Sequence, residues 1–166
     1  IRRYEKLVGR FPYNHYLIVE NTKPTGFGLP TFTLLGTQVL RLPFIINTSL
    51  GHEILHSWFG NSISVSLDSG NWCEGLTTYL ADMAYREDLH EGGLARKEKV
   101  QEYLSYVKPD TLPLEDFRSP GHAAGGSRAS RAVGYGRAAL LFHELKLRVG
   151  EALFNETISL FYKKYR

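Results

Sequence analysis

With 166 residues, 43% of them hydrophobic and 22% charged, the chain has the length and composition of one globular domain. Its net charge is only +3 and its Lys and Arg residues are scattered, which argues against a nucleic-acid-binding protein. The single cysteine excludes an internal disulfide framework, and no apolar run approaches the roughly eighteen residues that a membrane span requires.

The first part of the chain is expected to form the end of a helix and two strands. Basic and apolar residues mix over residues 1–10 in the manner of an amphipathic helix. A β-rich run follows at residues 15–20, and a second at residues 28–36, where Pro30 indicates an edge strand. Peptidases commonly bind an extended peptide at such an edge through backbone hydrogen bonds. A plain edge strand without a ligand is the alternative.

Residues 52–56 read His-Glu-Ile-Leu-His, a pattern that predicts a zinc site. On a helix, His52 and His56 lie on the same face, so both imidazoles can bind one ion. Glu53 can then lie beside a water on the metal without being a ligand itself. It is therefore the candidate general base.

A second helix, expected from about Trp72 to Glu87, supplies the third ligand. Glu74 lies near its start, and seventeen residues separate it from His56, enough for the first helix to end and the second to return. Catalytic zinc sites have three protein ligands and one open position. His52, His56 and Glu74 therefore predict one zinc ion. A buried histidine-rich helix beside an ordinary acidic helix start is the alternative.

Residues 143–144 are another His-Glu pair, which lacks the rest of the pattern. Residues 143–147 read His-Glu-Leu-Lys-Leu, with leucine where the second histidine would stand. We expect this segment to be an ordinary helix surface.

The C-terminal half is expected to be helical over residues 94–107, from Ala132 onward, and over residues 151–165. Two of these helices have candidate inner faces, which are Val100, Tyr103, Leu104 and Val107, and Leu153, Phe154, Ile158 and Phe161.

Residues 1–166 are expected to form a single catalytic domain. Because the chain opens at Ile1 without a methionine, we expect it to be a fragment of a longer protein, whose other domains would be its partners. The sequence does not indicate a cellular compartment.

Residues 48–82 resemble the catalytic core of the aminopeptidase N family of gluzincin zinc metallopeptidases, to which the leukotriene hydrolase/aminopeptidase also belongs. The resemblance rests on residues 52–61, His-Glu-Ile-Leu-His-Ser-Trp-Phe-Gly-Asn, and on residues 74–82, Glu-Gly-Leu-Thr-Thr-Tyr-Leu-Ala-Asp. It extends more weakly from Phe11 to the C-terminus. The interval between the second histidine and the glutamate is one residue shorter than usual, and Cys73 stands where the family often has asparagine.

The resemblance implies an α+β, thermolysin-like fold, with a small edge sheet, a mostly helical bundle and the metal site between them. It implies zinc-dependent hydrolysis of a peptide substrate, with Glu53 passing a proton from water to the leaving amine. Residues 133–142 resemble the family's Tyr-x-Lys-Gly segment, which assigns oxyanion stabilisation to Tyr135, with Arg137 in place of lysine. A core or surface tyrosine is the alternative.

The edge strand departs from the family. There it carries Gly-x-Met-Glu-Asn, whose glutamate binds the free amino terminus, whereas residues 26–32 here contain no carboxylate. We therefore expect a relaxed or lost requirement for a free amino terminus, with exo- or endopeptidase activity undecided. Arg128, Arg131 and Arg137 surround Tyr135 in sequence, where they could bind a substrate carboxylate or be solvated charges.

Other interpretations stay open. A zinc hydrolase of a non-peptide substrate would use the same residues, as the leukotriene hydrolase implies. A non-catalytic zinc domain would have a closed four-ligand site and no use for Glu53. Thr78, one helical turn after Glu74, could hydrogen-bond a ligand histidine or simply pack. Cys73 is interpreted as a small buried hydrophobic residue.

Overall fold

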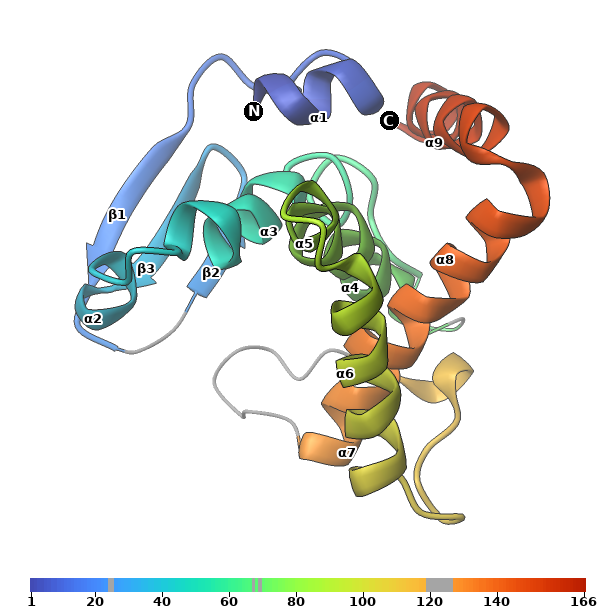
Figure 1. Cartoon of the computed structure of the whole chain (residues 1–166). Helices are drawn as coiled ribbons and strands as arrows, with labels where there is room; N and C mark the ends of the chain where they lie inside the picture. The colour runs from blue at the N-terminus through green and yellow to red at the C-terminus, as the bar shows by residue number, and fades with distance from the viewer. Residues whose placement is uncertain (24–25, 67, 69, 119–126) are drawn as a thin grey trace. The chain divides into compact units, whose positions relative to one another are not determined.

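The computed structural model of the chain describes residues 1–23, 26–66, 68, 70–118 and 127–166. They divide into two compact units: unit 1 is Ile1–Ser64 with Leu145–Arg166, and unit 2 is Val65–Glu144. Figure 1 shows their elements, which are mainly helices with one three-stranded sheet. Within the described ranges, no helix has both the length and the apolar character needed to cross a bilayer.

Unit 1 contains the sheet and the helix that carries the first His-Glu pattern. Its elements are α1 (Arg2–Leu7), β1 (Leu17–Asn21), β2 (Gly26–Leu29), β3 (Phe32–Gly36), α2 (Thr37–Leu40), η1 (Ile45–Asn47), α3 (Ser49–Leu55) and α9 (Glu151–Tyr165).

The sheet has the order β1-β3-β2, with β1 parallel and β2 antiparallel to β3. The prediction of one strand over residues 28–36 was wrong, because β2 and β3 form a hairpin. Pro30 is confined to a negative φ and Thr31 takes a φ of +71°, so the chain reverses there and Leu29 pairs with Phe32. The hairpin makes β2 an edge strand that packs on α3.

Trp58 is the centre of the core of unit 1. It is fully buried, its indole N–H donates to the carbonyl of Gly9 at 3.0 Å, and the rings of Tyr4 and Phe11 meet it edge-on. α1 packs against α9. The buried face of α9 differs from the predicted one: Leu153 is exposed, and the buried residues are Phe154, Ile158 and Tyr162.

Unit 2 is helical in its described residues. Its elements are α4 (Trp72–Thr77), η3 (Thr78–Met83), α5 (Ala84–Asp88), α6 (Gly92–Tyr106), η4 (Leu114–Asp116), α7 (Arg128–Arg131), η5 (Ala132–Arg137) and α8 (Ala138–Val149), the last of which continues into unit 1.

Two of these helices are each built from three successive segments. α4, η3 and α5 form one continuous helix, which confirms the helix predicted from Trp72 to Glu87. α7, η5 and α8 form the other, which begins four residues before the predicted Ala132. In each, the middle segment is a π-helix.

η5 packs against both α4 and α6. Two glycines permit close packing within unit 2. A Cβ on Gly75 would overlap Ala138, and a Cβ on Gly134 would overlap the ring of Phe117. The contact between α4 and α8 therefore depends on the glycine at position 75.

The predicted inner face of α6 was wrong. Val100 and Leu104 are 44% and 72% exposed, whereas the buried positions are Gly92 and Ala95. Tyr103 contacts Arg137 on the neighbouring helix, so Leu104, one residue further along α6, points away from that helix.

Candidate metallohydrolase active site

α3 presents the first three predicted site residues. His52, Glu53 and His56 are all buried, and the two imidazole centroids lie 4.9 Å apart. The regular helix ends at Leu55, and His56 is its C-terminal cap residue. The N–H of His56 still donates to the carbonyl of His52 at 3.2 Å, so the two rings keep the one-turn spacing that the pattern requires.

A backbone hydrogen bond sets the tautomer of His56. Its Nδ1 lies 3.0 Å from the carbonyl oxygen of Phe59. Because a carbonyl can only accept, Nδ1 carries the proton and donates it. Nε2 then keeps its lone pair, which is the atom a metal would bind.

β2 covers Glu53 through two glycines. A Cβ on Gly28 would lie 2.8 Å from Oε2 of Glu53 and 3.2 Å from Cβ of His56, and one on Gly26 would lie 3.0 Å from Oε1 of Glu53. Any side chain at these positions would therefore displace the carboxylate. The sequence analysis missed this role, although two glycines at alternate positions of a strand signal a close approach on one face.

One oxygen of the Glu53 carboxylate has no hydrogen-bond partner among the described residues. Oε2 is buried and makes no hydrogen bond to any described residue, and the same is true of the Tyr16 hydroxyl. Burial and the charge of Glu53 both raise the pKa of Tyr16, which therefore stays protonated at neutral pH. Tyr16 is a second residue that the sequence analysis missed.

Glu74 lies in the first turn of α4 and is buried. Asn71 caps this helix: its side-chain oxygen accepts from the N–H of Cys73 at 3.2 Å and from its thiol at 3.0 Å. Burial, and then the charge of Glu74, raise the pKa of the Cys73 thiol. Cys73 is thus a buried neutral residue, as predicted.

Of the two alternatives for Thr78, the structure favours packing. Its hydroxyl is buried and has no hydrogen-bond partner among the described residues, so the bond to a ligand histidine is not made. Thr78 begins the π-helix η3, directly after α4.

Three buried side chains form a group that could hold a metal ion. One nitrogen from each of His52 and His56 and one carboxylate oxygen of Glu74 lie within 4.8 Å of one another. Two imidazoles and a carboxylate are a ligand set typical of catalytic zinc. The structure thus contains a candidate metal site of the predicted kind.

Tyr135 lies on η5, the π-helix that packs against α4 in unit 2. Its ring is half-buried, meets Phe117 edge-on at 5.9 Å between centroids, and has the Arg131 guanidinium 5.9 Å from its centroid. π-helical segments are rare and often occur at functional sites. The catalytic role of Tyr135 stays a prediction.

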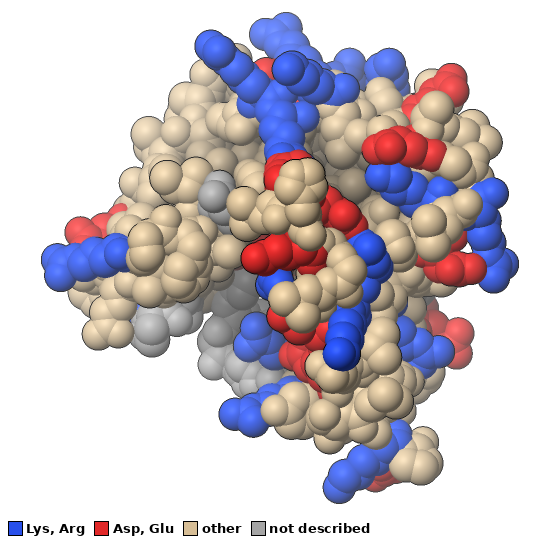
Figure 2. All heavy atoms as spheres, in the orientation of Figure 1, with Lys and Arg blue, Asp and Glu red and all other residues tan. Residues whose placement is uncertain are grey.

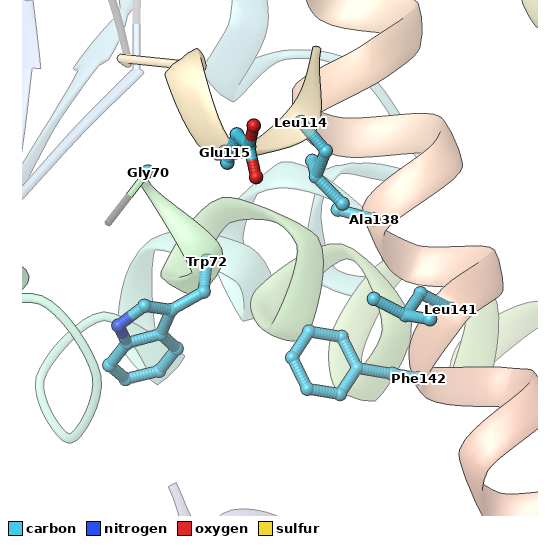
Figure 3. Close-up of a pocket in the computed structure, with 7 residues that line it drawn as sticks. All are labelled: Gly70, Trp72, Leu114, Glu115, Ala138, Leu141 and Phe142. Atoms are coloured by element: carbon cyan, nitrogen blue, oxygen red, sulfur yellow. The ribbon is translucent and has the colours of Figure 1, made fainter. Parts of the chain in front are cut away.

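A separate pocket of about 340 Å³ lies within unit 2. Figure 3 shows Trp72 and Phe142 beside it, with the carboxylate of Glu115 at the opposite side. Its lining includes none of the predicted metal or catalytic residues, so it is not the predicted site.

No family model and no curated protein sequence matches the chain. Among solved structures, it is similar to leukotriene A4 hydrolase from Saccharomyces cerevisiae, with 22% identity and a TM-score of 0.74 over 99% of this chain and 28% of that one.

It is also similar to the M1 zinc metallopeptidase from Deinococcus radiodurans, with 22% identity and a TM-score of 0.69. A mutant of that protein bound to the substrate Tyr-Ser-Ala gives 21% identity and a TM-score of 0.71. In both cases the match covers 99% of this chain and 35% of the neighbour, so the chain spans about a third of their length. The helix-rich chain with its small sheet therefore has the fold of part of an M1 peptidase catalytic domain.

Proposed function

We propose that the chain is the catalytic domain of a longer, zinc-dependent peptidase with a thermolysin-like, gluzincin active site related to that of the aminopeptidase N family. The observation that carries this proposal is the buried group of His52, His56 and Glu74. The neighbours of known structure support it, because they are a zinc metallopeptidase and a leukotriene A4 hydrolase.

The three residues fit a zinc ion in donor type. Nδ1 of His56 lies against the carbonyl oxygen of Phe59, which leaves Nε2 as the atom that would bind the ion, and both histidines and the glutamate are buried, as ligands of a structured site are. A structural zinc would have four protein ligands, and this group has three. When bound, zinc supplies a Lewis acid that lowers the pKa of water toward neutrality.

Glu53 would be the general base. Its buried Oε2 makes no bond within the described residues, so it is available to accept a proton from the attacking water and to pass it to the leaving amine. The backbone of β2 holds the carboxylate from one side at Gly26 and Gly28. Tyr135 would donate its hydroxyl hydrogen to the developing oxyanion, a role that the resemblance supplies.

The substrate would be a peptide that adds to the sheet at β2. β2 is an edge strand and lies directly against Glu53, so a peptide aligned with it would pass close to the base. Because residues 26–32 contain no carboxylate, nothing on this strand pairs with a substrate ammonium. We infer a relaxed or lost dependence on a free amino terminus.

The test compares free and N-acetylated forms of the same peptides, with the full-length enzyme and with a chelator control. Cleavage of both forms, abolished by the chelator, is expected. Cleavage of the free forms alone, one residue at a time from the amino end, would instead establish an aminopeptidase.

Hydrolysis of a non-peptide substrate is a second candidate, favoured by the similarity to leukotriene A4 hydrolase. It would use the same zinc ligands and Glu53. Chelator-sensitive turnover of an epoxide or ester with no cleavage of any peptide in a mixed library would support it over the peptidase.

A further inference from the structure

Three arginines on α7 and η5 of unit 2 have no acidic partner among the described residues. Arg128, Arg131 and Arg137 lie on α7 and η5, are exposed, and form no ion pair with any described residue. The residues outside the described ranges contain no Asp or Glu, so they offer no carboxylate side chain either. These three residues are called the arginine group below.

Two other arginines of unit 2 are paired with acidic side chains. Arg86 pairs with Glu91 at 2.7 Å and with Glu98 at 3.1 Å, and Arg96 pairs with Glu87. Figure 2 shows acidic and basic side chains intermixed over α5 and α6. The arginine group differs from these two arginines because it forms no ion pair with a described residue.

Tyrosines on α6 hold two of the arginines in place. Arg128 donates to the hydroxyl of Tyr106 at 3.1 Å with its guanidinium 5.5 Å from that ring centroid. Arg137 donates to the hydroxyl of Tyr103 at 3.1 Å, and its guanidinium lies 5.4 Å from the centroid of that ring. Each guanidinium has five N–H donors, so most remain available after one bond to a tyrosine. Stacking on the ring fixes the plane of those donors and reduces the entropy lost on binding a ligand.

The arginine group adjoins a residue assigned to the chemistry. The guanidinium of Arg131 lies 5.9 Å from the ring centroid of Tyr135, and η5, which carries Tyr135, packs against the helix of Glu74. A ligand anion that Arg131 contacts would therefore lie near Tyr135.

We propose that the arginine group binds a carboxylate of the peptide substrate, either its C-terminal carboxylate or an acidic side chain. This inference rests on the proposed function and adds a preference for acidic peptides to it. Oriented guanidinium groups bind carboxylates with two parallel hydrogen bonds. A polyanion such as a nucleic acid is disfavoured, because α6 also carries Glu98 and Glu102.

The experiment uses the full-length enzyme and pairs of peptides that differ only in one charge: a C-terminal acid against its amide, and an internal Glu against Gln. For at least one pair we expect kcat/KM to favour the acid by about tenfold or more at low salt, as one charge-assisted interaction allows. The preference should shrink as ionic strength rises.

The double variant Arg128→Gln/Arg137→Gln should bring the ratio of kcat/KM for acid over amide close to one, mainly through KM. The matched control Arg96→Gln removes an arginine that is already paired on α6, and should leave the ratio unchanged. Tyr103→Phe/Tyr106→Phe keeps both charges and should give an intermediate ratio.

Equal cleavage of acid and amide in both pairs by the unaltered enzyme would overturn the inference and leave the peptidase proposal intact. A preference for the acid that the double variant retains would also overturn it. Absence of cleavage of every peptide would overturn the proposed function itself.

Discussion

The chain contains two helical His-Glu pairs with opposite surroundings. His52 and Glu53 on α3 are buried under β2 and belong to a group that could hold a metal. His143 on α8 is half-buried with its Nδ1 3.3 Å from the hydroxyl of Tyr79, Glu144 is exposed, and Leu145 is 45% exposed. The same two residue types therefore serve as a candidate active site in one place and as a helix surface in the other.

The difference shows what converts a common dipeptide into a site. The first pair has a second histidine one turn later, a carboxylate from another helix, and two glycines that let a strand close over the base. The second pair has none of these among the described residues. Burial without a hydrogen-bond partner, as at Oε2 of Glu53, is costly unless another group completes the site.

The largest difference in activity is expected between variants of the two glutamates of these pairs. Glu53→Gln should lower kcat/KM by about 10²–10⁴-fold while the metal content stays unchanged, because a general base is lost and no ligand is removed. The matched variant Glu144→Gln alters the exposed glutamate and should have normal activity. Equal activities of the two variants would contradict the assignment of Glu53.

Tyr135→Phe should lower kcat by about 10²–10³-fold with little change in KM, because an oxyanion donor acts mainly in the transition state. Tyr165→Phe, on the exposed side of α9, is the control and should be neutral. Steady-state kinetics of both variants on the same peptide would measure this difference. A variant at position 135 with near-normal kcat would remove this tyrosine from the mechanism.

Gly28→Ala tests the packing of β2 over Glu53 on α3, which has no counterpart at Glu144 on α8 among the described residues. The added methyl would meet the backbone oxygen of Glu53 at 2.8 Å, and we expect a loss of about 1–3 kcal/mol in unfolding free energy as well as reduced activity. Gly93→Ala on α6 meets only the end of Arg96 at 4.0 Å and should stabilise by about 0.5–1 kcal/mol. Urea denaturation measures both. A neutral result at Gly28 would show that β2 does not press on Glu53.

The smallest effect is expected for Tyr16→Phe. Its hydroxyl is buried without a partner in the described fold, so its removal should leave the unfolding free energy unchanged or slightly higher, and kcat within a few-fold. Thermal denaturation and kinetics check this together. A tenfold fall in kcat would instead show that Tyr16 positions Glu53.

The parts that the sequence predicted well depend on local spacing. The one-turn spacing of His52 and His56 needs only a helical backbone between them. The backbone hydrogen bond from His56 to His52 maintains that turn. The helix from Trp72 was predicted to within one residue at its end, because its apolar pattern continues without a break.

The features that the sequence did not predict depend on contacts between residues that are distant in the sequence. The exposure of Leu104 follows from the pairing of Tyr103 with Arg137, 34 residues away. The two π-helices and the unpartnered hydroxyl of Tyr16 have no signature in the local sequence. The close approach of β2 could have been inferred from Gly26 and Gly28, because they alternate on one strand face.

The central claim, that zinc binds at the helix of His52 and Glu53 and not at that of His143 and Glu144, is tested most directly by metal content. We would measure zinc by mass spectrometry in the full-length protein and in His56→Ala and His143→Ala, after exposure to zinc and removal of excess. One ion per chain is expected in the unaltered protein and in His143→Ala, and a loss of that ion in His56→Ala. Retention of a full equivalent in a folded His56→Ala variant, or none in the unaltered protein, would contradict the account.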